Sequence, residues 1–278
     1  MNSNCKDPVS GVNFQAWQPP GDLIALASGE AHLWYAWTEK CCTPRRLARY
    51  RSLLSEQEHQ RLECFRFDHI KREYLLTRAL CRFTLSRYAN VSPSAWQFRT
   101  NEFGRPEIAS PDAPPSLRFN LANATSLVAC LVAFDIDAGV DVEETNREGE
   151  VTDLVDRYFS QSEVRALRAL PLPEQRRRFF QLWTLKESYI KARGMGLSIP
   201  LEQFSFELDE PPPIRISFDP VLEDVATDWQ FQTFAPSVDL LMAVGLRRGN
   251  VPDLRISVAE TIPGVVVDRF QNDKDIAY

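Results

Sequence analysis

The 278-residue sequence lacks three features that would each indicate a particular class of protein. Its six cysteines include no Cys-x-x-Cys pair and no Cys/His cluster with zinc-ligand spacing, so a zinc site is not expected. The longest strongly apolar run, 127–134, is far too short to cross a bilayer, and the first residues show no signal pattern. A formal net charge of −6 does not provide the positive surface that nonspecific nucleic-acid binding requires. These absences argue against membrane and nucleic-acid partners and make the cytoplasm the default compartment, with reduced thiols.

The composition is that of an ordinary globular protein, with 44% hydrophobic and 25% charged residues. The length allows either one large domain or two halves of about 130 residues each. Helix and strand patterns are mixed in a similar way in both halves of the chain, so a duplicated α+β unit is one possibility.

Local patterns predict the order of the elements. Ser55 with Glu58, and Ser160 with Glu163, form two capping boxes that each open a helix. Further helices are predicted at 66–88, at 153–159 and from about 174 to Gly194. The predicted strands are 31–38, 117–120, 126–134, 140–142, 204–208, 215–218, 229–234 and 240–246, with another near Ile256. The turn at 135–139 predicts that 126–134 and 140–142 form a hairpin, whereas 1–30 is expected to be a loosely packed lead-in and the end of the chain a polar tail.

Two carboxylates lie two residues apart in the strand predicted at 140–142. Asp141 and Glu143 would therefore point to the same face of that strand. Two adjacent like charges raise the cost of ionising each other, which favours a cation between them. The alternative is that both side chains face solvent on an edge strand.

A third carboxylate, Glu187, lies in the long helix, where apolar residues cover most of the circumference. It could instead form an ion pair with Lys191 at the i,i+4 spacing. Magnesium prefers oxygen ligands and is commonly shared between carboxylates and substrate phosphates. Lys186 and Lys191 could neutralise such phosphates. This set of residue types is suited to phosphoryl-type transfer, in which positioning and charge neutralisation supply most of the catalysis.

Six segments together resemble the 4′-phosphopantetheinyl transferases of the surfactin-activating (Sfp) type. They occur in the order typical of that family and cover most of the chain. The segments are LSEQE at 54–58, KREYLLTRALCR at 71–82, NEFGRP at 101–106, GVDVE at 139–143, RYFSQSE at 157–163 and LWTLKESYIKARGMGLSIPL at 182–201.

The resemblance implies an α+β fold of two similar α/β halves that divide near residue 136, with the active site in the cleft between them. The N-terminal half would be 1–135, the C-terminal half 136–250, and 251–278 an extension of unknown role. A chain with such an internal duplication is expected to be a monomer. The implied reaction moves the 4′-phosphopantetheine arm of coenzyme A onto a serine of an apo acyl or peptidyl carrier protein and releases adenosine 3′,5′-bisphosphate. The sequence does not indicate whether the carrier serves fatty-acid, polyketide or peptide synthesis.

The resemblance also implies roles for particular residues. Asp141, Glu143 and Glu187 would hold Mg²⁺, and Glu187 would also act as the general base for the carrier serine. Lys191 would bind phosphate, with Lys186 nearby. The cofactor-binding set would be completed by Arg72 and Arg105 at the nucleotide end of coenzyme A and by Asn123. A separate hypothesis follows from the net charge: because this chain is itself acidic, attraction of an acidic carrier would have to come from local basic residues such as Arg157, Arg165 and Arg168.

One segment departs from the family pattern. Where many relatives have Phe-Asn-[Ile/Leu]-Ser-His-Ser, this sequence has FNLANA at 119–124. Asn123 replaces a histidine that contacts phosphate, and it can donate a hydrogen bond but carries no charge. This change motivates a second hypothesis, a noncatalytic module that binds coenzyme A or the carrier, although such a module would have little use for three carboxylates. A magnesium nuclease is a third, but the basic surface it would need is missing.

Overall fold

The computed structural model describes residues 23–27, 29–147, 149, 151–208 and 213–265. The helices are α1 (Thr38–Cys41), α2 (Pro44–Arg51), α3 (Glu56–Cys64), α4 (Asp68–Leu85), α5 (Thr152–Tyr158), α6 (Gln161–Arg168) and α7 (Leu172–Arg193). The strands are β1 (Glu30–Trp37), β2 (Phe98–Thr100), β3 (Pro106–Ile108), β4 (Leu117–Asn123), β5 (Leu127–Phe134), β6 (Ala138–Glu144), β7 (Phe204–Glu207), β8 (Arg215–Phe218), β9 (Trp229–Ser237), β10 (Leu240–Arg247) and β11 (Arg255–Glu260). This mixture of helices and several sheets confirms the predicted α+β class. None of the described helices is long and apolar enough to span a membrane.

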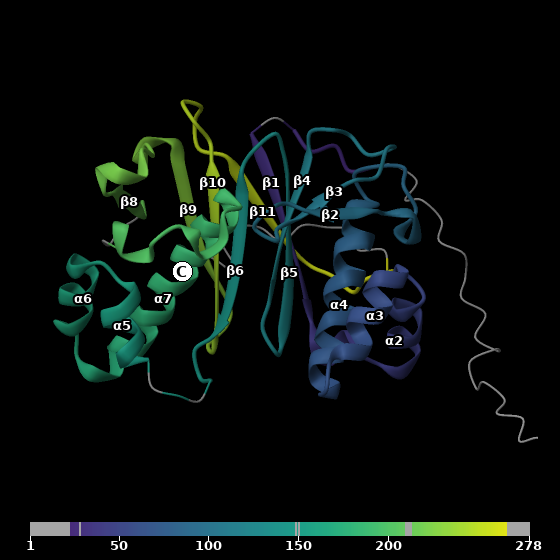
Figure 1. Cartoon of the computed structure of the whole chain (residues 1–278), viewed down its shortest axis with the longest axis horizontal. Coiled ribbons are helices and arrows are strands. Elements are labelled where there is room, and N and C mark those ends of the chain that lie inside the picture. The colour runs from purple at the N-terminus through teal and green to yellow at the C-terminus, as the bar shows by residue number, and fades with distance from the viewer. Residues whose placement is uncertain (1–22, 28, 148, 150, 209–212, 266–278) are drawn as a thin grey trace, which may run out of the picture.

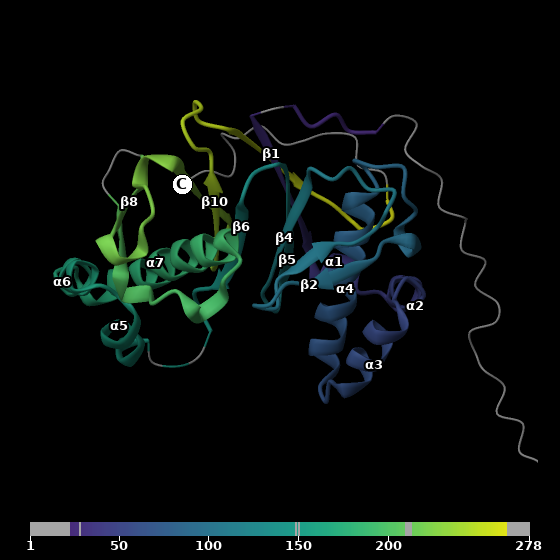
Figure 2. The same ribbon diagram turned by 45° about the horizontal axis from the view of Figure 1, so that its top comes forward.

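Two larger sheets form the middle of the molecule (Figure 1). The first has the order β11-β1-β5-β4 and the second the order β6-β10-β9. Their facing sides share an apolar core that includes Leu33, Leu131, Val140 and Val244. Helices α1–α4 cover the outside of the first sheet and α5–α7 the outside of the second, which gives four layers in the order helix, sheet, sheet, helix (Figures 1 and 2).

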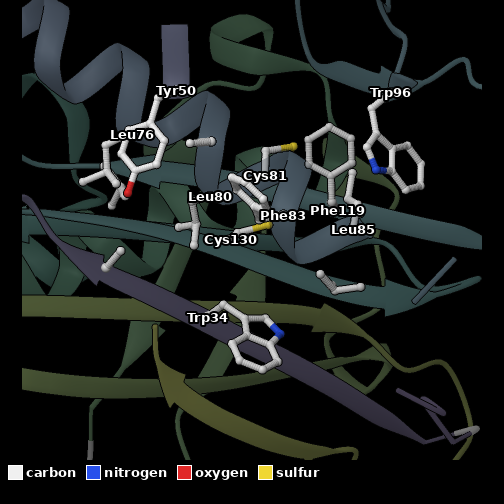
Figure 3. Packing of buried hydrophobic residues seen from close by; sticks show 14 of the residues in the cluster. Trp34, Tyr50, Leu76, Leu80, Cys81, Phe83, Leu85, Trp96, Phe119 and Cys130 are labelled. Carbon is white, nitrogen blue, oxygen red and sulfur yellow. The ribbon is translucent and has the colours of Figure 1, made fainter. Parts of the chain in front are cut away.

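The outer face of the first sheet packs on α4, the helix predicted at 66–88. The buried side of α4 carries Leu76, Leu80 and Cys81, which share a core with Trp34 of β1 and Cys130 of β5 (Figure 3). The capping box predicted at Ser55 and Glu58 is confirmed, because each residue bonds the backbone N–H of the other at the start of α3. The opposite face of α4, which carries Arg72, stays exposed.

The predicted hairpin of β5 and β6 is wrong. Strand β5 pairs on one side with β1 and on the other with β4, so neither of its edges is free for a third strand. The chain instead crosses at 135–137 to the second sheet, where β6 pairs antiparallel with β10. A side chain links the two sheets at this crossing, since the Val140 N–H donates to Asn120 Oδ1 of β4 at 3.0 Å.

The predicted C-terminal extension contributes to the first sheet. Arg255–Glu260 forms β11, which pairs parallel to β1 at the sheet edge. The strand expected near Ile256 is thereby confirmed. The expectations for the first 22 residues and for 266–278 concern parts of the chain outside the described residues.

Gly139 allows α7 to pack unusually close to β6. A Cβ atom at this position would lie 2.1 Å from the Ser188 carbonyl oxygen and 2.4 Å from the Ala192 nitrogen, both in the backbone of α7. Because strand residues alternate between faces, Asp141 and Glu143 are on the same face of β6 as Gly139. Val140 and Val142 point the other way, into the core between the sheets.

A matched pair of substitutions tests this close packing. Gly139→Ala should lower the free energy of unfolding by about 3 kcal/mol or more, because the methyl group meets helix backbone that cannot move alone. Gly245 is the partner of Gly139 in the β10 register, but its added Cβ would mainly meet the Phe231 ring, at 2.8 Å. Since that ring can shift, Gly245→Ala should cost about 1 kcal/mol. Urea denaturation of both variants measures the difference, and equal losses would contradict this account.

Candidate active site

Asp141 lies at the centre of the site, between β6 and α7. Its side chain is buried, the residue being only 6% exposed, and Oδ1 accepts a hydrogen bond from Lys191 Nζ at 2.7 Å. Oδ2 is also buried, yet it has no hydrogen-bond partner among the described residues. A buried carboxylate oxygen without a partner is costly and is typical of a site that takes a further ligand. The alternative in which Asp141 faces solvent on an edge strand is therefore wrong, although β6 does lie at a sheet edge.

Glu143 is the second carboxylate on this face of β6. Its Oε2 atom lies 2.8 Å from Arg147 Nη1, and the side chain of Trp183 also donates a hydrogen bond to it. Burial is the main cause that raises the pKa of Glu143, and the charge of Asp141 raises it further, to about 7. The positive charges of Arg147 and Lys191 do not offset these two effects, so the negative charge of ionised Glu143 is only partly neutralised in this structure.

Glu187 comes to the same place from α7. Burial and the charge of Asp141 raise the pKa of Glu187, whereas Lys191 lowers it. The alternative of an i,i+4 ion pair is not found: within the described ranges no ion pair joins Glu187 to Lys191, whose ammonium contacts Asp141 instead. Asp141, Glu143, Glu187 and Lys191 thus interact with one another between β6 and α7.

The chemistry of this set suits a hard divalent cation, although the described residues contain no group of three or more His, Cys, Asp and Glu side chains already arranged around a metal position. Lys191 and Arg147 neutralise two of the carboxylates. Three observations still favour a cation here: the donors are all oxygens, Asp141 Oδ2 has no described partner, and the pKa values of Glu143 and Glu187 are raised.

Lys186 does not belong to this set, and the prediction that it neutralises phosphate is wrong in this structure. Its ammonium is fully buried on another side of α7, since consecutive helix residues are rotated by about 100°. It contacts Glu163 at 2.8 Å and donates to the carbonyl oxygens of Leu201 and Phe204 at 2.7 and 2.6 Å. These contacts use all three ammonium protons.

The sequence reading missed this partner of Lys186. Glu163 was identified only as a capping-box residue, and the structure confirms that role: its Oε2 accepts from the Ser160 N–H at 2.9 Å. The same carboxylate accepts from the Phe206 N–H and binds Lys186, so it fastens α6, α7 and β7 together. A charged capping residue followed by a lysine in an apolar helix was the available signal.

The remaining predicted ligands are in two other places. Arg105 Nη1 donates to the Ala192 carbonyl oxygen at 3.1 Å, and Nη2 contacts Glu107 at 3.2 Å. Arg105 also lines a cavity of about 360 Å³, together with Arg99 and Arg118.

Asn123 and Arg72 lie elsewhere, near the contact between β4 and α4. The side-chain amide of Asn123 donates a hydrogen bond to Glu73, the residue after the exposed Arg72. The sequence did not predict this role for Glu73. Its carboxylate lies beside Asn123, which was predicted to contact phosphate.

Comparison with known proteins identifies the family. Residues 137–245, which include β6 and α7, match the 4′-phosphopantetheinyl transferase superfamily. The chain is 32% identical to the 4′-phosphopantetheinyl transferase Sfp of Bacillus subtilis over 208 residues, which cover 74% of this chain and 87% of that protein. It is 28% identical to the transferase HetI of Nostoc sp., over 83% of this chain and 93% of that protein. Among solved structures, the holo-[acyl-carrier-protein] synthase of Thermotoga maritima aligns with 41% of this chain and 63% of its own, at 18% identity and a TM-score of 0.33.

The similarity to these transferases over most of the chain identifies an enzyme of group transfer. The chain belongs to the 4′-phosphopantetheinyl transferases, and specifically to the type that includes Sfp and HetI. It transfers the 4′-phosphopantetheinyl group to carrier proteins.

The raised pKa of Glu143 predicts a pH-dependent loss of stability without divalent cations. A carboxyl group whose pKa is higher in the folded than in the unfolded state stabilises the fold below the unfolded value, and this contribution is lost as the pH rises through the folded value. The free energy of unfolding of the wild type should therefore fall, relative to Glu143→Gln, between about pH 4.5 and about pH 7. Urea denaturation in a chelator at several pH values measures this difference. If the free energy of unfolding depends on pH in the same way for both proteins, the pKa of Glu143 is not raised in the folded state.

Proposed function

We propose that this transfer depends on Mg²⁺ and uses coenzyme A, with Asp141, Glu143 and Glu187 as the protein ligands of the ion. The observation that supports this most strongly is the buried Oδ2 of Asp141, which has no hydrogen-bond partner in the described part of the chain and lies beside two carboxyl groups with raised pKa values. Bound Mg²⁺ would neutralise charge on the pyrophosphate of coenzyme A and polarise the phosphorus atom that the carrier serine attacks. The family supports coenzyme A and Mg²⁺ in general terms.

Glu187 would accept the proton of the carrier serine. A serine hydroxyl is a weak nucleophile at neutral pH, and a base is most effective when its pKa is close to the working pH. Burial and the charge of Asp141 raise the pKa of Glu187, which moves it in the direction that this role favours. The serine oxygen then forms the new bond to phosphorus, the bond to the pyrophosphate's bridging oxygen breaks, and adenosine 3′,5′-bisphosphate leaves with the electron pair.

Lys191 would bind the phosphates of coenzyme A. Its ammonium now contacts Asp141 and is partly exposed, so it can exchange a carboxylate oxygen for a phosphate oxygen without leaving the site. Arg147 is in a similar position beside Glu143. Both cations would then offset the charge that develops on the leaving group.

The nucleotide end of coenzyme A would lie toward Arg105, whose cavity of about 360 Å³ also presents Arg99 and Arg118. Arg72 and Asn123 would contact the ligand from the side of α4. The contribution of Asn123 to coenzyme A binding is expected to be small, because its side-chain amide already donates a hydrogen bond to Glu73. The four layers of helices and sheets support two similar halves that divide near residue 136, and such a chain would work as a monomer (Figure 1).

Substitution of Glu187 tests these roles. Wild-type protein with coenzyme A, Mg²⁺ and an apo carrier should add the mass of one phosphopantetheinyl group to the carrier, read by mass spectrometry. Glu187→Gln should lower the rate by at least about 100-fold, because it removes the base and a metal ligand while keeping the shape of the side chain.

The controls separate the possible outcomes. Glu202→Gln changes another glutamate of the C-terminal half, one that is exposed, and should leave the rate unchanged. A fully active Glu187→Gln variant would contradict the assignment of Glu187. No mass shift by the wild type on a panel of fatty-acid, polyketide and peptide carriers would instead favour the noncatalytic module.

The outer surface of α5 and α6 would attract an acidic carrier. Arg157, Arg165 and Arg168 are all exposed there, and only Arg168 has an acidic partner among the described residues, Asp156. Reversal of all three charges to glutamate should raise the KM for the carrier roughly tenfold, and more at low salt, with the affinity for coenzyme A unchanged. Steady-state kinetics and calorimetry measure the two quantities. Carrier kinetics like those of the wild type would place the docking surface elsewhere.

A further inference from the structure

The loop at 101–106 contacts the C-terminal end of α7 across the boundary between the two sets of layers. Asn101 Nδ2 donates to the Gly194 carbonyl oxygen at 2.9 Å, and Arg105 Nη1 donates to that of Ala192 at 3.1 Å. The last carbonyl groups of a helix have no partner within the helix, so these two donors complete the end of α7. The cationic guanidinium also suits the negative end of the helix dipole.

Asn101 uses its whole side chain in this arrangement. While the amide nitrogen reaches α7, Oδ1 accepts from the N–H groups of Phe103 and Arg105 at 3.0 and 2.9 Å and so shapes its own turn. One residue therefore both folds the loop and ties it to the helix end. A side chain with both a donor and acceptor sites on adjacent atoms is needed for this.

The helix end is shaped to receive the loop. Gly194 has a φ of 66°, in the left-handed region that favours glycine, and its N–H donates to the carbonyl oxygens of Ile190 and Lys191. A Cβ on Gly194 would lie 2.4 Å from Arg105 Cζ. Any other residue at this position would strain the backbone turn and displace the guanidinium of Arg105.

Lys191 lies in the turn that this contact fixes. Its ammonium contacts Asp141 of β6, while its carbonyl oxygen and the two residues that follow complete the capped helix end. A shift of the last turn of α7 would move this ammonium relative to Asp141 and Glu187. Catalytic groups that stabilise a transition state lose effect rapidly when they are displaced.

We propose that Asn101 is a positioning residue for the transfer reaction, which it serves by holding the last turn of α7 and thus Lys191 in place. This inference rests on the proposed role of Lys191. It assigns to the loop a function separate from ligand binding, since Asn101 acts through the helix and not on the substrate.

The substitution Asn101→Asp separates the two functions of the side chain. The carboxylate can still accept from Phe103 and Arg105, but it has no proton to donate and repels the Gly194 carbonyl oxygen. We expect amide exchange in the last turn of α7 to become roughly tenfold faster, while the amides of Phe103 and Arg105 keep their protection. Glu102→Gln, in an exposed residue of the same turn, is the matched control and should change neither.

Kinetics provide the functional readout. We expect kcat to fall roughly tenfold in Asn101→Asp while the KM for the carrier stays constant. The value is expressed per coenzyme A-binding site, counted by calorimetric titration, so that unfolded protein does not contribute. If Asn101→Asp does not fold, Asn101→Ser replaces it, because a serine hydroxyl can accept from the loop but is too short to reach Gly194.

An unchanged kcat per site in a variant with a loosened helix end would overturn the proposal. So would equal loss of protection in the loop and the helix, which would mean that Asn101 serves only to fold the loop. If the wild type fails to modify any carrier, the proposed function itself fails. Hydrogen exchange alone then still decides whether Asn101 holds the turn.

Discussion

The close contact between α7 and β6 is the constraint on which the site depends. Gly139 has no side chain, and the backbone of α7 occupies the space that a Cβ would need. This contact places Asp141 against the last turns of the helix and brings Glu187 and Lys191 to it. Burial then raises the cost of each negative charge, and this cost is the physical basis of the cation site that we propose here.

The two lysines of α7, Lys186 and Lys191, lie in different surroundings. Lys186 is enclosed by Glu163 and two carbonyl oxygens, so its charge holds the C-terminal helices to β7. Lys191 is partly exposed and contacts Asp141, where it can exchange partners. Loss of either Lys186 or Glu163 would leave the other as a buried charge without its partner, whereas Lys191 is accessible enough for the ligand-binding role that we propose.

Much of this could be predicted from the sequence. Capping boxes and periodicity located α3, α4, α6 and α7, and the shared face of Asp141 and Glu143 followed from the period of a strand. The wrong hairpin shows the limit of local patterns: whether β5 pairs with β6 depends on which strands occupy the edges of β5, and these come from distant segments. The place of Lys186 was missed for the same reason, since its partners come from α6 and from 201–204. Asn123 was identified as a departure, but its partner Glu73 became visible only when α4 and β4 were placed side by side.

The central claim is that Asp141, Glu143 and Glu187 jointly bind a divalent cation between β6 and α7. A crystal structure with coenzyme A and Mn²⁺ tests it most directly, because the anomalous scattering of manganese locates the ion independently of the protein chain. This account predicts an anomalous peak within bonding distance of oxygens from all three carboxylates and of the pyrophosphate, with the Lys191 ammonium moved from Asp141 to a phosphate oxygen. A peak at any other position, or a Lys191 that still contacts Asp141 beside bound coenzyme A, would contradict it.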